Sequence, residues 1–216
     1  GPGDDAVNAG GGDDLVFGGP GDDRLGGGAG DDTLIGGEGE DFIFAGTGAD
    51  TVFAGAGNDW ILAENDALGD YLDGGEGDDD IRASGTGSVA LGGGGRDYLY
   101  ALTGEAAQLL GGPGDDVLVV LVGNTQLDGG SGDDEYQVTL SSPDRSATLV
   151  WGTGLGNDEL LAIGGTLNVE LTADVFAENV AIATARRAIG APLRHVGGSG
   201  PTPPAPGPGG PGGPPP

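Results

Sequence analysis

The sequence of 216 residues predicts an all-β fold in which short strands stack as a parallel β-solenoid. Three observations lead to this prediction. Residues 18–44 contain three consecutive nine-residue units, GGPGDDRLG, GGAGDDTLI and GGEGEDFIF, which all obey G-G-x-G-x-D-x-U-x with U an aliphatic residue. The 51 glycines follow the same period, so this composition indicates order rather than low complexity. In every regular unit the aspartate and the aliphatic residue stay two positions apart.

Each part of the unit has a physical role. Glycine tolerates positive φ and lets backbones approach closely, so G-G-x-G can turn the chain tightly and aim carbonyl oxygens inward. The aspartate adds charge to that group of oxygens, and a hard cation such as calcium takes about six to eight oxygen ligands. The x-U-x segment is a very short strand, in which U faces the opposite way from its two neighbours. One half of the unit therefore turns and binds, and the other half packs.

The sixth-position aspartates are the predicted metal ligands. Their spacing is nine residues through the first seven units, and the eighth unit, residues 63–73, is longer by two residues that we expect to bulge from the loop. After the ninth unit the spacing roughly doubles, because poor units alternate with good ones. The aliphatic partners, from Val7 to Ile81, are expected to face the core. The predicted ligands are Asp5, Asp14, Asp23, Asp32, Asp41, Asp50, Asp59, Asp70, Asp79, Asp97, Asp116 and Asp134.

These units resemble the haemolysin-type calcium-binding repeats of the repeats-in-toxin (RTX) family. The resemblance implies a right-handed parallel β-roll with two nonapeptides per turn and calcium ions between loops stacked on the same edge. One edge would carry Asp5, Asp23, Asp41, Asp59, Asp79, Asp97, Asp116 and Asp134. The other would carry Asp14, Asp32, Asp50 and Asp70 and then lose its carboxylates. One ion in each gap gives roughly ten calcium ions.

Acidic residues at the fifth position leave two alternatives open. Their carboxylates ligate the metal directly, or their side chains stay solvated while their backbone carbonyls contribute. These residues include Asp13, Asp22, Asp31, Asp78, Asp115 and Asp133.

The sequence divides into three predicted segments. Residues 1–137 form the calcium-binding β-roll. Residues 138–191 form a degenerate repeat, with a partial motif around Asp158, and a β-rich cap, because the last repeats of a solenoid must close its exposed core. Residues 192–216 form a tail rich in proline and glycine, which is typical of disordered or polyproline II chain.

Charge excludes several classes of function. The chain has 35 acidic residues against seven basic ones, all arginine, and a formal charge of −28. It lacks the basic surface that nucleic acids require and any apolar run long enough to span a bilayer.

Cysteine is absent, and neither a zinc ligand set nor a nucleophile with its base is present, so we expect no enzyme activity. Such an acidic chain should repel itself and stay unfolded until cations neutralise it.

The predicted function is calcium binding by a secreted, extracellular module that folds on extracellular calcium. Because the sequence begins inside a repeat, we expect a larger secreted protein. The alternatives are the C-terminal module of a secreted toxin or hydrolase with its catalytic domain upstream, and a structural or adhesive solenoid. Besides calcium, the expected partners are an upstream domain or a second copy bound through an aromatic outer face with Phe42, Phe44, Trp60 and Tyr98. Plain β propensity also explains these aromatic residues.

Overall fold

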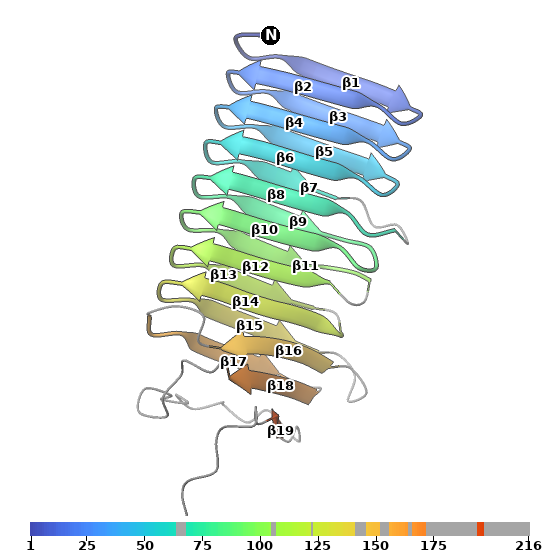
Figure 1. The fold of residues 1–216 in the computed structure, drawn as a ribbon. Helices are drawn as coiled ribbons and strands as arrows, with labels where there is room; N and C mark the ends of the chain where they lie inside the picture. The colour runs from blue at the N-terminus through green and yellow to red at the C-terminus, as the bar shows by residue number, and fades with distance from the viewer. Residues whose placement is uncertain are drawn as a thin grey trace, which may run out of the picture.

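The structure is a computed structural model, and it describes residues 1–63, 68–104, 107–121, 123–140, 146–151, 156–163, 166–171 and 194–196. Within these ranges all regular elements are strands, which stack along one axis from the N-terminus onward (Figure 1). The predicted fold class, an all-β parallel β-roll, is confirmed. The described residues include no helix long and apolar enough to cross a membrane.

The strands alternate between two parallel sheets that face each other. The first sheet contains β1 (Ala6–Gly11), β3 (Arg24–Ala29), β5 (Phe42–Thr47), β7 (Trp60–Leu62), β9 (Asp80–Ala83), β11 (Tyr98–Ala101), β13 (Val117–Val120), β15 (Glu135–Thr139) and β17 (Glu159–Ile163). The second contains β2 (Leu15–Pro20), β4 (Thr33–Glu38), β6 (Thr51–Ala56), β8 (Tyr71–Glu76), β10 (Val89–Gly94), β12 (Gln108–Pro113), β14 (Thr125–Ser131), β16 (Ser146–Trp151), β18 (Thr166–Leu171) and β19 (Arg194–Val196). One turn of the roll therefore uses one strand from each sheet.

The register follows the repeat. Val16 pairs with Leu34 in the next turn of its sheet, so one turn consumes two nonapeptides, as the resemblance implied. At the longer eighth unit, Val52 pairs with Leu72, and the register resumes after the insertion. The bulge expected there falls on residues 64–67, which lie outside the described residues.

The core is a column of aliphatic side chains between the sheets. Leu34, Ile43, Ile61 and other residues at the U position are completely buried, because each is covered by the turns before and after it. Val7 is in register with the core residue Leu25, as predicted, but its side chain is 38% exposed. It belongs to β1, the edge strand of its sheet, and so has a neighbouring strand on one side only.

The turns between strands depend on glycine at the second and fourth positions of the unit. Gly37 and Gly39 have φ of +135° and +126°, a region that favours glycine. A Cβ on either residue would also collide with the backbone carbonyl of Gly19 or Gly21 in the preceding turn. Glycine therefore allows both the turn conformation and the close stacking of consecutive turns.

Strands continue past the predicted end of the roll. β16 pairs with β14, β17 with β15 and β18 with β16, so these three strands extend both sheets where a β-rich cap was expected. Residues 172–193 lie outside the described residues, as does the tail apart from β19. The boundaries at residues 138 and 192 stay a prediction.

Candidate metal-binding edges

The first edge of the roll holds a continuous ladder of aspartates, here called the long ladder. Its predicted members are Asp5, Asp23, Asp41, Asp59, Asp79, Asp97, Asp116 and Asp134, one in each turn. The backbone N–H of each donates to Oδ1 of the next, as from Asp23 to Asp41 at 2.8 Å and from Asp97 to Asp116 at 2.9 Å. The predicted grouping of these residues on one edge is confirmed by the hydrogen bonds.

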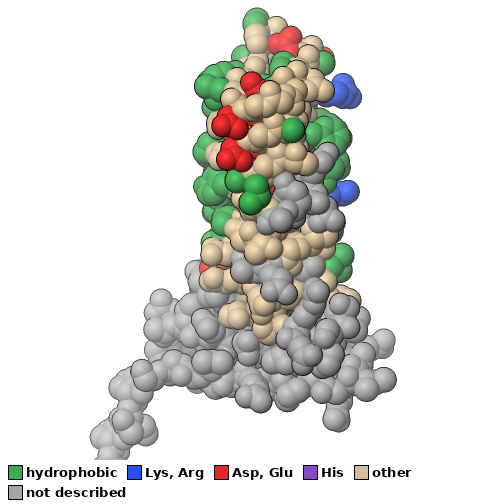
Figure 2. All heavy atoms as spheres, turned by 90° about the vertical axis from the view of Figure 1, so that its right-hand side faces the viewer, with side chains coloured by type: hydrophobic (Ala, Val, Ile, Leu, Met, Phe, Trp, Pro, Cys, Tyr) green, Lys and Arg blue, Asp and Glu red, His purple; other side chains and the backbone are tan. Residues whose placement is uncertain are grey.

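The opposite edge holds the short ladder, with Asp14, Asp32, Asp50 and Asp70, joined in the same way. The N–H of Asp70 then donates to Oγ of Ser88 at 3.2 Å, and the following turns place Ala107 and Thr125 at this position. This is the right-hand edge of Figure 1, which Figure 2 views directly, and acidic side chains gather over its N-terminal turns. The two edges are therefore unequal, as the sequence predicted.

The fifth-position side chains form an outer ladder that runs in the opposite direction. Oδ1 of Asp22 accepts the N–H of Glu40 in the next turn at 2.9 Å, and Oδ1 of Asp78 accepts that of Arg96 at 2.7 Å. These groups are exposed, and their bonds connect consecutive turns. Their part in metal binding stays a prediction.

Most of the sixth-position carboxylates are buried, and nine of them have one oxygen atom, Oδ2, that accepts no hydrogen bond. From Asp23 to Asp134 they are at most 3% exposed. While Oδ1 accepts a backbone N–H, Oδ2 has no hydrogen-bond donor in Asp14, Asp23, Asp32, Asp41, Asp59, Asp79, Asp97, Asp116 and Asp134. A buried acceptor without a donor is costly, and a charged one more so.

The surroundings of Oδ2 fit a cation. A Cβ built on Gly36 would meet both Oδ2 of Asp41 and the backbone carbonyl oxygen of Ala54 in the next turn, so two acceptors approach the same point. Oxygen atoms from carboxylates and carbonyls are the ligands that calcium prefers. Among the described residues, no three Asp, Glu, His or Cys side chains form a metal-binding group. Main-chain carbonyls of the glycine-rich turns would therefore complete the coordination shell. The role of the twelve aspartates as ligands stays a prediction.

Burial raises the pKa of several aspartates in the long ladder. It raises the pKa of Asp59, Asp97 and Asp134 from 3.8 to about 6, and that of Asp79 and Asp116 to about 7. The N–H of the preceding aspartate lowers each pKa, and neighbouring carboxylates raise it again. The folded roll without metal therefore holds protons that the unfolded chain would release.

These shifts predict a pH dependence of the metal-free chain. Because the folded-state pKa values lie above the unfolded value, the folded state binds more protons, and its stability falls as pH rises through about 7. Circular dichroism of metal-free chain should show more β structure at pH 5 than at pH 8. With millimolar calcium the trend should reverse, because protons compete with the ion for the carboxylates. The same spectrum at both pH values without metal would contradict the prediction.

Three residues with a place in these edges were missed as site residues. Ser88 ends the short ladder, whereas Asp158 continues the long one, because the N–H of Asp134 donates to its Oδ1 at 3.2 Å. Tyr136 occupies a U position, but its hydroxyl oxygen reaches the edge and accepts the N–H of Gly129 at 2.9 Å. The partial motif around Asp158 was the available signal. Because Asp158 lies 24 residues after Asp134, more than the 18 residues of two regular units, the spacing alone does not place the two aspartates in the same register.

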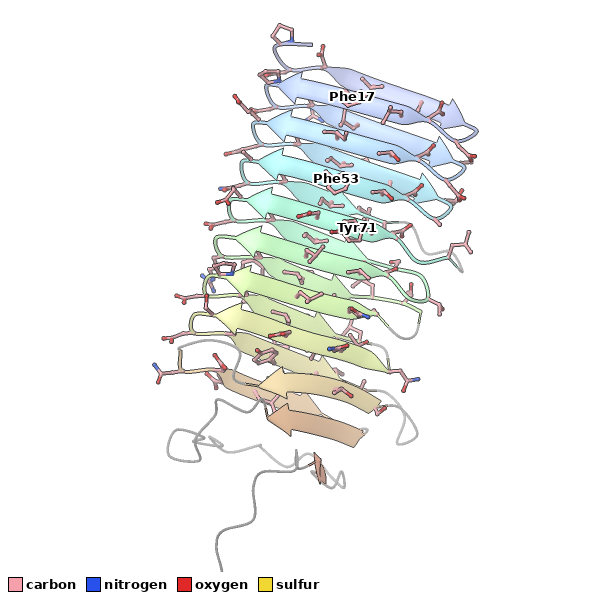
Figure 3. The ribbon with its side chains drawn as sticks, viewed as in Figure 1. Phe17, Phe53 and Tyr71 are labelled. Carbon is pink, nitrogen blue, oxygen red and sulfur yellow. The ribbon has the colours of Figure 1, made fainter. Side chains whose placement is uncertain are left out.

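The outer faces of both sheets carry aromatic residues. On the first sheet, Phe42 stacks on Trp60 with ring centroids 4.1 Å apart, and the guanidinium of Arg82 lies 5.3 Å from the Trp60 ring. On the second, Phe17 and Phe53 are 60% and 40% exposed, a feature that sequence reasoning missed. Figure 3 shows both with Tyr71 along one face.

Comparison with protein families agrees with this geometry. The family described as the RTX calcium-binding nonapeptide repeat matches in four copies, over residues 1–34, 26–61, 69–86 and 108–136. No curated protein matches the chain.

Proposed function

The chain belongs to the family of RTX calcium-binding nonapeptide repeats, and on that basis we propose that it is a secreted module that folds when it meets extracellular calcium. Calcium binding is the property of the repeats themselves. The observation that carries the proposal is the stack of buried aspartates whose Oδ2 atoms have no hydrogen-bond donor. Such an arrangement is unfavourable until a cation compensates the charge.

The proposed mechanism is linkage between binding and folding. The ladders exist only when consecutive turns are stacked, so calcium binds the folded chain and hardly the unfolded one. Its binding free energy then becomes folding free energy. Roughly ten divalent ions would also change the formal charge from −28 to about −8 and so relieve the repulsion within the roll.

Individual residues have distinct parts in this mechanism. Calcium supplies the positive charge between turns. The sixth-position carboxylates of the long and short ladders hold it, and glycines at the second and fourth positions keep the turns close enough for main-chain carbonyls to take part. The fifth-position carboxylates align the turns through hydrogen bonds to backbone N–H groups, as between Asp22 and Glu40.

Affinity would decide where the chain folds. Extracellular calcium modules bind with dissociation constants of about 10⁻⁴ to 10⁻³ M, which leaves them empty in the cytosol and loaded outside the cell. The chain could then be exported unfolded and become rigid afterwards. Proteins of this repeat family are generally secreted, which supports this order of events.

A calcium titration tests the proposal. In chelator at pH 7.5 we expect the circular dichroism of an unfolded chain, and millimolar calcium should produce a β-sheet spectrum. Equilibrium dialysis with metal analysis counts the ions bound. A chain that is folded in chelator would refute the folding mechanism, and a chain that binds no calcium would refute the function. Magnesium serves as the control, because it is smaller and dehydrates reluctantly.

We assign no catalytic role to this chain, and the alternative of a toxin or hydrolase module is decided by the coding sequence upstream of Gly1. A structural or adhesive solenoid that self-associates through Phe42, Phe44 and Trp60 is the other alternative. The stacking of these rings on one another favours local packing instead. Sedimentation of the calcium-loaded chain as a monomer would exclude self-association.

A further inference from the structure

We propose that the long ladder has one more cation site, in the gap between Asp134 and Asp158, and that the hydroxyl of Tyr136 borders it. This inference rests on the proposed calcium function. Asp134 and Tyr136 belong to the last family match, which ends at residue 136, whereas Asp158 lies beyond it and beyond the regular nonapeptides.

The backbone of this gap repeats the pattern of the regular gaps. The N–H of Asp134 donates to Oδ1 of Asp158 at 3.2 Å, as each ladder aspartate does to the next. The outer ladder continues too, because the N–H of Asn157 donates to Oδ1 of Asp133 at 2.7 Å. The N–H of Glu159 donates to the carbonyl of Asp134 at 2.7 Å. Although the two turns are 24 residues apart rather than 18, their loops are therefore in the same register.

A buried acceptor faces this gap. Asp134 is 2% exposed, and its Oδ2 has no hydrogen-bond donor. A Cβ on Gly129 would meet this Oδ2 and the hydroxyl oxygen of Tyr136. The corresponding point on Gly111 meets Oδ2 of Asp116 and the carbonyl oxygen of Gly129 in the next turn. The phenol oxygen of Tyr136 thus lies beside Oδ2 of Asp134, as a main-chain carbonyl oxygen lies beside Oδ2 of Asp116.

Tyr136 is held in this position. Its side chain is 1% exposed, and its hydroxyl oxygen accepts the N–H of Gly129 at 2.9 Å. Every other U position of the regular units carries an aliphatic residue or alanine, which could not bring an oxygen to the edge. The aromatic residue therefore places an oxygen beside the carboxylate where the nonapeptide pattern ends.

The short ladder ends differently from the long ladder. There the N–H of Asp70 donates to Ser88, whose Oγ in turn donates to the carbonyl of Ser84. A neutral hydroxyl replaces the carboxylate and finds its own acceptor, so the gap between Asp70 and Ser88 has lost one charge. The gap between Asp134 and Asp158 keeps both carboxylates. Its two negative charges therefore favour a bound cation more than the single charge of the gap between Asp70 and Ser88.

Ion counting on three variants tests the site. Asp158→Asn should bind one calcium ion fewer than the wild-type chain in equilibrium dialysis with metal analysis. Glu159→Gln is the matched control, because it removes an exposed carboxylate from the next residue, and it should bind the wild-type number. Tyr136→Phe should keep that number but weaken the affinity for one ion by about tenfold in a calcium titration.

The outcomes separate this inference from the proposed function. A wild-type chain that binds no calcium refutes the function, whereas an unchanged ion count in folded Asp158→Asn refutes the additional site alone. If Asp158→Asn fails to fold, the Tyr136→Phe titration decides: unchanged affinities for all ions overturn the inference, and a tenfold loss at one ion supports it. Circular dichroism in calcium establishes that each variant is folded before the count.

Discussion

Replacing Asp97 by asparagine is expected to lower the free energy of unfolding in saturating calcium by about 3 kcal/mol and to raise it without calcium. Asp97 lies in the middle of the long ladder and is completely buried. Its Oδ1 accepts the N–H of Asp79 at 2.9 Å, and its Oδ2 has no donor. Asparagine can keep the first bond through its carbonyl oxygen, but it brings no charge to the ion. Without calcium the same change removes a buried charge, so the sign reverses.

Urea unfolding in saturating calcium measures the first effect. Because the metal-free chain is expected to be unfolded in buffer alone, the second effect is measured as the concentration of a stabilising osmolyte that folds each metal-free chain at pH 8. The pKa of Asp97 is raised to about 6 by burial, so at pH 8 the wild-type residue is charged in the folded state. Glu76→Gln is the control: it removes an exposed carboxylate and should change stability by less than about 0.5 kcal/mol under either condition. A variant that is destabilised equally with and without calcium would show that Asp97 acts through packing and hydrogen bonding alone.

Equilibrium dialysis with metal analysis of Asp78→Asn distinguishes the alternatives for the fifth position. Its Oδ1 accepts the N–H of Arg96 at 2.7 Å, a bond that asparagine can keep. Loss of a bound ion in this variant would indicate direct carboxylate ligation, and wild-type binding would indicate a role through the backbone.

Most of the fold could be predicted from the nine-residue period of the sequence. An aspartate and an aliphatic residue two positions apart face the same side of an extended chain, so both point into the roll, as Asp23 and Leu25 do. The unequal edges could be predicted from the spacing of the aspartates together with the two units per turn that the family resemblance implies. The exposure of Val7 could not, because the pattern is identical in a terminal and an internal turn and only stacking distinguishes them.

Other parts of the site arise from three-dimensional contact. The opposite directions of the long ladder and the outer ladder depend on which backbone N–H each carboxylate meets in the neighbouring turn. The raised pKa of Asp79 requires its burial between other carboxylates. Asp158 joined the ladder although the chain between it and Asp134 is longer than two units, a length that no local pattern relates to the register.

Two neighbouring glycines should show how strictly the turns must stack. In saturating calcium, Gly95→Ala is expected to lower the free energy of unfolding by about 4 kcal/mol. Gly95 has φ of +130°, a conformation that alanine rarely adopts. Its Cβ would also collide with the backbone carbonyl oxygen of Gly77 in the preceding turn, and backbone cannot move aside without separating the two loops. Calcium sites between these loops should weaken together with the fold.

Gly94→Ala is the matched control, because the same methyl group is added one residue earlier. The φ of Gly94 is outside the left-handed region, and the nearest atom to its Cβ is Oε2 of Glu76 at 3.1 Å, the end of a flexible exposed side chain. Alanine there also reduces the freedom of the unfolded chain, so stability should change by less than about 1 kcal/mol. Urea unfolding of both variants measures the difference. Equal stabilities would mean that the loops can separate without cost, which is incompatible with oxygen ligands shared between consecutive turns.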